Sequence, residues 1–145
     1  MRYSRHIPLD ILIADDNPAD IEMLRLAFTE AGVPSRLHAI ANGAEVIPHL
    51  KRRGPQSQPA LVILDLNLPK ESGLNVLRGL QRHPALRRIP AVLLSGFLSR
   101  ADKAAAEAEG ALCFEKPFVF EDWIALACRL AALWHKTRTA LPSAA

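Results

Sequence analysis

The sequence is short of features that would point to a secreted or membrane protein. Its 145 residues contain only two cysteines, Cys113 and Cys128, which form neither a disulfide framework nor a metal-ligand spacing. This usage is typical of a reducing cytoplasm, so we expect a cytoplasmic protein. No uninterrupted apolar run reaches ~18 residues, and the amino-terminal segment lacks the apolar core of a signal peptide. We therefore expect no export signal and no membrane contact.

Aromatic residues are also scarce, at 6%, and they are not interleaved with the basic residues. The formal net charge is +3, but the lysines and arginines are dispersed along the chain. A nucleic-acid site would need a basic groove with aromatic stacking platforms. We therefore favour a solvated basic surface and expect no nucleic-acid partner. The acidic residues instead cluster early, between Asp10 and Glu22, which suits a cation near that segment.

What the chain does have is a 50% share of hydrophobic residues and a length that fits one domain. Short apolar runs alternate with helix-start signals such as Asn17-Pro18, Ser72-Gly73 and Ser99-Arg100. The runs expected to form strands cover residues 9–14, 35–41, 61–64, 89–94 and 111–115. This alternation predicts an α/β domain with a doubly wound (βα)5 fold. Its five-stranded parallel sheet should have the flavodoxin-like order 2-1-3-4-5.

Two features concern the lengths of the helices. Pro48 falls inside the second helix, which begins near Asn42, so we expect a kink or a short helix there. The last helix is expected over residues 121–138. The domain should therefore span residues 1–138, and residues 139–145 should form a disordered tail.

Polar side chains stand where four of the expected strands end. Asp15 and Asp16 follow the first strand, Asp65 the third, Ser95 the fourth and Lys116 the fifth. In an open parallel sheet, ligands bind beyond the carboxyl ends of the strands. Three carboxylates this close repel one another unless a cation lies among them, and hard oxygen ligands suit Mg²⁺. A carboxylate beside Mg²⁺, a hydroxyl and an ammonium is a competent nucleophile for a phosphoryl group.

The joint pattern resembles the CheY-like receiver domain of response regulators in two-component signalling. Asp15-Asp16, Asp65, Ser95 and Lys116-Pro117 match the family's signature, and residues 65–73 have its D-x-N-x-P…G spacing. The resemblance covers residues 8–136. Residues 17–20 and 66–70 are most similar to those of the single-domain regulators that partner phytochrome-type histidine kinases.

The resemblance implies a phosphorelay function without any separate enzymatic activity. Asp65 would accept a phosphoryl group from a sensor histidine kinase, and Lys116 and Ser95 would contact that group. Pro117 would follow a cis peptide bond that turns Lys116 inward. The implied Mg²⁺ ligands are Asp15 (mainly through water), Asp16, Asp65 and the backbone carbonyl of Asn67.

One part of the chain departs from the family's pattern. The usual aromatic switch residue lies three positions before the lysine, where this chain has Cys113, and Phe114 follows it. Side chains alternate along a strand, so Cys113 and Phe114 should face opposite sides of the sheet. Whether either of them replaces the usual switch stays open.

Alternative functions would use the same residues. A pseudo-receiver would bind partners without phosphate, but the intact set of Asp65, Ser95, Lys116 and the acidic pair argues against it. A flavin protein would want a phosphate cradle after the first strand, where two aspartates would repel a phosphate. A haloacid-dehalogenase-type phosphatase would want an aspartate in place of Asn67. In the simplest interpretation, Asp65 caps a turn and Lys116 pairs with it without phosphate.

The signal is expected to leave through the fourth and fifth helices, by a homodimer or by a kinase contact. Trp123 and Trp134 lie eleven residues apart (134 − 123) on the last helix, or about three turns, so they share one stripe. Aromatic residues are enriched in interface cores, so a tryptophan left partly exposed would mark a contact surface. The alternative is that both tryptophans belong to the core.

Overall fold

Five parallel strands form one sheet in the computed structural model, which describes residues 7–140, with the backbone alone from residue 136 onward. The strands pair in the order β2-β1-β3-β4-β5, as predicted, and every pair is parallel. Their bounds are β1 (Leu9–Ala14), β2 (Ser35–Ile40), β3 (Leu61–Leu64), β4 (Ala91–Ser95) and β5 (Leu112–Glu115).

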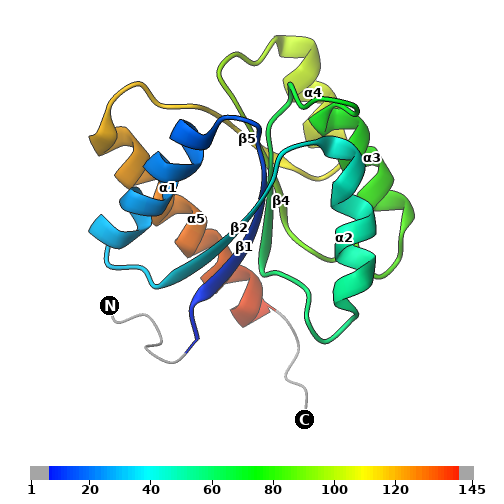
Figure 1. Ribbon diagram of the computed structural model, residues 1–145, viewed down its shortest axis with the longest axis horizontal. Helices are drawn as coiled ribbons and strands as arrows, with labels where there is room; N and C mark the ends of the chain where they lie inside the picture. Colours follow the sequence, from blue (N-terminus) through cyan, green and yellow to red (C-terminus); the bar gives the residue numbers. More distant parts are fainter. Residues whose placement is uncertain (1–6, 141–145) are drawn as a thin grey trace.

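Helices cover both faces of the sheet (Figure 1). Helices α1 (Pro18–Glu30) and α5 (Phe120–Ala140) lie on one face, and α2 (Val46–Arg53), α3 (Gly73–Arg82) and α4 (Arg100–Ala108) lie on the other. Side chains alternate along β1, so Ile11 and Ile13 join the core beneath α1 and α5. Leu12 and Ala14 join the core on the opposite face. The doubly wound (βα)5 prediction is therefore confirmed.

The helix starts follow from local side-chain chemistry. The Oδ1 atom of Asn17 accepts the Ala19 amide at 3.0 Å, and Pro18 occupies the first helical position of α1. The hydroxyls of Ser72 and Ser99 cap α3 and α4 in the same way, at 3.2 and 3.0 Å. Each cap satisfies a backbone donor that the helix itself leaves unpaired.

The second helix is short, as Pro48 led us to expect. The Oδ1 atom of Asn42 accepts the Glu45 amide at 3.1 Å and begins a single 3₁₀ turn, Gly43–Glu45. The α-helical part, α2, has only eight residues. Pro48 therefore lies in the first turn of α2, where its missing N–H costs no helical hydrogen bond.

The last helix extends two residues beyond the expected end at Arg138, to Ala140. The rest of the expected tail, residues 141–145, lies outside the described residues. Trp123 is buried at 3% exposure, whereas Trp134 is half-buried at the margin of the same core. In the part of the chain that the structure describes, no helix is long and apolar enough to cross a bilayer.

Candidate functional site

The carboxyl ends of four strands bring the predicted residues to one edge of the sheet. Pairing continues one residue past β1 and β3, because the Asp65 amide donates to the Ala14 carbonyl at 2.9 Å. It continues past β4 and β5 as well, where the Lys116 amide donates to the Ser95 carbonyl at 2.8 Å. Asp15 is 3% exposed, Asp65 7% and Ser95 fully buried. The register of the sheet therefore places the backbone of each of these residues at the same edge.

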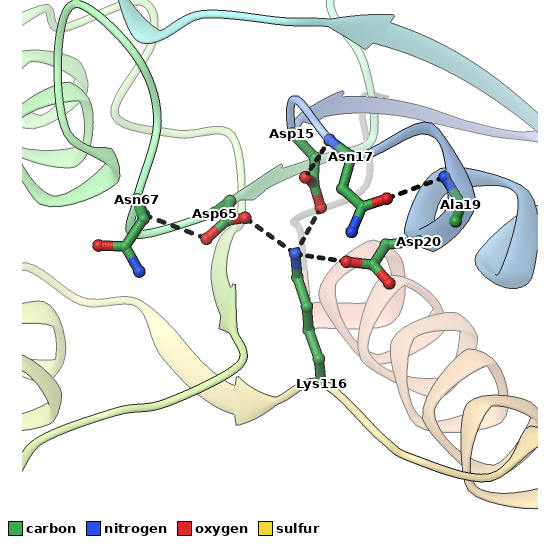
Figure 2. A network of polar contacts seen from close by, with 7 residues as sticks. All are labelled: Asp15, Asn17, Ala19, Asp20, Asp65, Asn67 and Lys116. Atoms are coloured by element: carbon green, nitrogen blue, oxygen red, sulfur yellow. Dashed lines mark hydrogen bonds and ion pairs between the residues drawn. The ribbon is translucent and has the colours of Figure 1, made fainter.

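Lys116 is the centre of a network of ion pairs (Figure 2). Its Nζ atom lies 2.8 Å from Asp65 Oδ2, 2.9 Å from Asp15 Oδ2 and 2.8 Å from Asp20 Oδ2. The salt bridge between Lys116 and Asp65 that the sequence left open is thus present. The lysine side chain is only 13% exposed, so solvent screens these contacts less than it screens a surface ion pair.

Burial and charge shift the pKa values of two groups in this network. Burial raises the pKa of Asp15, the negative charge of Asp65 adds to that rise, and the hydrogen bond from Lys116 partly offsets it. Burial alone would lower the pKa of Lys116. Its hydrogen bonds to Asp20, Asp65 and Asp15 outweigh that effect and raise the pKa above its usual range. Lys116 is therefore an ammonium at neutral pH.

Three carboxylates at this edge fit a divalent cation. Asp15, Asp16 and Asp65 each offer an oxygen atom, and these atoms all lie within 4.8 Å of one another. Two of the carboxylates are buried and Asp16 is exposed, which leaves a side open to water. A hard cation such as Mg²⁺ is bound in this way, by a few carboxylates with water in the remaining positions. The Asn67 amide donates to Asp65 Oδ1 at 3.1 Å, so the backbone of Asn67 adjoins the cluster.

Ser95 supplies a hydroxyl at the end of β4. Its Oγ atom is buried and has no hydrogen-bond partner among the described residues. Most buried side-chain hydroxyls do have a partner, because an unpaired one costs about 1–3 kcal/mol. An oxygen-bearing ligand at this edge would satisfy it.

Cys113 and Phe114 face opposite sides of the sheet, as predicted. Cys113 packs with the core beneath α2, α3 and α4, and its Sγ atom lies 3.9 Å from the Lys103 carbonyl of α4. Phe114 packs with the core beneath α1 and α5, where the Arg129 guanidinium lies 4.6 Å from the centre of its ring. The position that the family fills with an aromatic residue therefore carries a small thiol against α4.

One expectation about Lys116 is wrong. The resemblance implied a cis bond before Pro117, but no peptide bond among residues 7–140 is cis. The side chain nevertheless reaches Asp65. The amide of Lys116 continues the pairing of β5 with β4, which places the residue at the sheet edge.

The sequence interpretation did not find the role of Asp20. In the sequence Asp20 follows the helix start at Asn17-Pro18, where a carboxylate favours the positive end of a helix. In the structure it is in the first turn of α1, and its carboxylate reaches Lys116. The available signal was its position, because the helix that follows β1 begins above the edge where β1 ends.

Gly73 packs closely against the backbone of Asp65. A Cβ atom at this position would overlap the backbone carbonyl oxygen of Asp65, and the Gly73 amide donates to Leu66 at 2.9 Å. We expect Gly73→Ala to lower the free energy of unfolding by about 1–3 kcal/mol, because the backbone must shift to admit the methyl group. Urea denaturation measures the change. Gly96→Ala is the control, since a Cβ there has no neighbour within 4 Å. Equal stability of the two variants would contradict the prediction.

Comparison with known proteins shows which family has this arrangement. The family model described as the response regulator receiver domain matches residues 11–127. The chain belongs to the response regulator receiver domain family. The probable methanogenesis regulatory protein FilR2 of Methanothrix harundinacea is 34% identical over 118 residues, which cover 79% of this chain and 76% of FilR2. Response regulator Rcp1 of Synechocystis is 28% identical over 141 residues, which cover 94% of this chain and 95% of Rcp1.

Two solved receiver structures share the fold. The phosphorylated cyanobacterial phytochrome response regulator RcpA superimposes with a TM-score of 0.79 at 29% identity, over 90% of this chain and 96% of RcpA. The Mn²⁺-bound form of Rcp1 gives a TM-score of 0.75 at 26% identity, over 88% of this chain and 94% of Rcp1. The predicted resemblance to receivers is therefore confirmed. The acidic cluster of this receiver is at the carboxyl edge of the sheet, where three carboxylates suit a divalent cation.

Proposed function

We propose that this receiver accepts a phosphoryl group on Asp65 from a histidine kinase and acts as a switch in a phosphorelay. The observation that carries the proposal is the position of Asp65. Its carboxylate is buried at the end of the central strand, 2.8 Å from the Lys116 ammonium and within the acidic cluster. A turn-capping aspartate would need none of these neighbours.

For phosphoryl transfer, the protein has mainly to position the reacting groups and to stabilise the charge on the phosphoryl oxygens. The Asp65 carboxylate forms a P–O bond as the P–N bond of the kinase's phosphohistidine breaks, and the imidazole keeps the electron pair. Lys116 stabilises the charge on the phosphoryl oxygens, and the Ser95 hydroxyl donates a hydrogen bond to one of them. Mg²⁺, bound by Asp15, Asp16, Asp65 and the Asn67 carbonyl, would neutralise charge on the transferring group. Only this self-phosphorylation and the later hydrolysis on Asp65 are proposed as reactions.

The partner that we propose is a phytochrome-type histidine kinase in the cytoplasm. The similarity to RcpA, a phytochrome response regulator, over nine-tenths of the chain supports this assignment. Two exposed aromatic side chains next to the site offer apolar contact area. Phe97 follows β4 at 72% exposure, and Phe118 follows Lys116 at 98% exposure. Such residues suit the centre of a protein interface.

We also propose that phosphorylation acts through association, by a homodimer or a kinase contact at α4, β5 and α5. Strand β5 is an edge of the sheet, and its side chains are only partly covered. Leu112 on this strand is 45% exposed, and Trp134 on α5 is half-buried. An uncovered edge strand with apolar side chains is a surface suited to a second chain.

The test of the acceptor function is Mg²⁺-dependent uptake of a phosphoryl group. Incubation with acetyl phosphate and Mg²⁺ should add one phosphoryl group per chain, as measured by intact mass. Asp16→Ala should abolish the uptake, because it removes one of the three carboxylates that would hold the cation. It should also leave the fold intact and slightly raise stability without metal, since like charges are relieved.

The control is Asp122→Ala, which removes an exposed carboxylate from the first turn of α5. It should retain full uptake. If the Asp16 variant labels with the same Mg²⁺ dependence as the wild type, the cation is bound elsewhere. If the wild type itself takes up nothing, the acceptor function fails.

A further inference from the structure

Asp20 makes a contact that no role in the proposed chemistry explains. Its Oδ2 atom lies 2.8 Å from Lys116 Nζ, a residue 96 positions away in the chain. Figure 2 shows the carboxylate reaching across from α1 to the lysine that rises from β5. An ammonium has three N–H donors, and the carboxylates that pair with it here are those of Asp15, Asp20 and Asp65. The Lys116 ammonium therefore has as many carboxylate partners as it has N–H donors, and Asp20 is one of these partners.

Asp20 differs from the other two partners in one respect. Asp15 and Asp65 both belong to the acidic cluster that fits a divalent cation, and Asp20 does not. A cation there would be bound by Asp15 and Asp65, the same carboxylates that pair with Lys116, and its positive charge would repel the ammonium. In the part of the chain that the structure describes, Asp20 is the one ion-pair partner of Lys116 that lies outside the candidate cation-binding cluster.

We propose that Asp20 is a positioning residue that keeps the Lys116 ammonium at the end of β5 once a divalent cation binds Asp15 and Asp65. The inference rests on the proposed acceptor function, because a lysine held at this place is what a phosphoryl group on Asp65 requires. Without Asp20, Lys116 would be repelled by the cation with no fixed carboxylate to hold it. It would then reach the phosphoryl oxygens only part of the time.

The segment that carries Asp20 is well fixed. The Asn17 amide donates to Asp15 Oδ1 at 2.9 Å, and the Asn17 side chain in turn accepts the Ala19 amide at 3.0 Å. Pro18 restricts the backbone between them. The side chain of Asp20 is 23% exposed, so its contact with Lys116 is partly shielded from solvent. These contacts hold the backbone at the start of α1, from which the Asp20 side chain reaches Lys116.

The charges lead to a second consequence. Four carboxylates and one ammonium give this edge a formal charge of −3 (−4 + 1), counting Asp16 with the three partners of Lys116. Loss of the Asp20 charge leaves −2 and frees Lys116 to pair more fully with Asp15 and Asp65. Both effects weaken the binding of a cation. Asp20 therefore contributes to cation affinity although it is not a ligand.

The test compares Asp20→Asn with Glu22→Gln. Glu22 is exposed on the same helix and pairs only weakly with Arg25, at 3.6 Å, so its variant removes a nearby charge without touching Lys116. Titration with Mg²⁺, followed by calorimetry, should show an affinity about fivefold to tenfold lower for Asp20→Asn, the size expected for the net contribution of one ordinary hydrogen bond. Glu22→Gln should change it less than about twofold.

Two further readouts separate positioning from a general loss of structure. At saturating Mg²⁺, uptake from acetyl phosphate should be about tenfold slower in Asp20→Asn, the loss expected when one charged contact of Lys116 is removed. The ¹⁵N signal of the Lys116 ammonium, measured with Mg²⁺ and no phosphodonor, should be sharp in the wild type and lost in Asp20→Asn. Asp20→Glu keeps the charge and should restore most of the Mg²⁺ affinity.

Several results would overturn the inference. They are an Asp20→Asn protein that matches Glu22→Gln in all three readouts, one that labels faster than the wild type, and an Asp20→Glu protein as impaired as Asp20→Asn. Faster labelling would mean that Asp20 competes with the phosphoryl group for Lys116. If the wild type takes up no phosphoryl group, the proposed function fails, but the titration and the ammonium signal still decide the role of Asp20.

Discussion

Asp65→Asn is expected to reduce phosphoryl uptake from one group per chain to none. An amide oxygen carries no negative charge and is too weak a nucleophile for phosphorus. Among the described carboxylates that pair with Lys116, Asp65 is the one at the end of the central strand. Asparagine has nearly the same shape, and its single amide oxygen can still accept from either the Lys116 ammonium or the Asn67 amide. The fold should therefore survive, and intact mass after incubation with acetyl phosphate and Mg²⁺ measures the loss.

A matched control is available on the neighbouring strand. Asp10 of β1 is also partly buried and also ion-paired, with Arg53 at 2.5 Å, but it lies at the opposite end of the strand. Asp10→Asn should keep full uptake even where it lowers the melting temperature. Labelling of Asp65→Asn to the wild-type level would show that the acceptor is another residue. Loss of labelling in both variants would point to a general effect on the fold.

Trp123→Ala is expected to give the largest loss of stability among the substitutions considered. The indole is 3% exposed and packs in the core between the sheet, α1 and α5. Removal of a buried aromatic side chain costs about 3–5 kcal/mol, because the apolar contacts are lost and a cavity remains. For a domain of this size that loss lowers the melting temperature by roughly 10–15 °C. Thermal melts followed by circular dichroism would measure it.

Trp134→Ala is the comparison that also tests the proposed association surface. Trp134 is half-buried, so its truncation should cost about 1–2 kcal/mol, less than that of Trp123. If α5 forms a homodimer, this variant should shift the protein toward monomer in sizing experiments. Equal melting losses for the two tryptophans would contradict the assigned burial. A wild type that stays monomeric with and without phosphodonor, and contacts no kinase through this face, would refute the association proposal.

The features that sequence predicted correctly are those set by neighbouring residues. Asn17 and Pro18 start α1 by a hydrogen bond and a fixed backbone angle that involve only the next residues. The alternation of apolar runs and caps then leaves few topologies for a parallel sheet. Because parallel strands end at one edge, the meeting of Asp15, Asp65 and Lys116 could be predicted as well. All three lie together in the structure.

The features that sequence missed depend on geometry between distant segments. The pairing of Asp20 with Lys116 requires the angle at which α1 leaves β1, and the position of Asp20 at the start of α1 does not by itself specify that angle. The sequence left open whether one of the two tryptophans, Trp123 and Trp134, would be partly exposed, because both share one helical stripe and their exposure depends on where α5 lies on the sheet. The expected cis bond before Pro117 was implied by the resemblance to the receiver family and not by the neighbouring residues. Lys116 reaches Asp65 without a cis bond among the described residues.

The sheet divides the apolar interior into two compartments, and this has a practical consequence for protein engineering. Leu12 and Ile13 are adjacent in β1 but belong to separate clusters, one beneath α2, α3 and α4 and the other beneath α1 and α5. Substitutions more than about 7–10 Å apart that share no packing partner usually add in free energy to within about 0.3–0.5 kcal/mol. The two compartments can therefore be redesigned independently and the variants then combined. A library that varies one side at a time would explore this domain with far fewer sequences than a joint one.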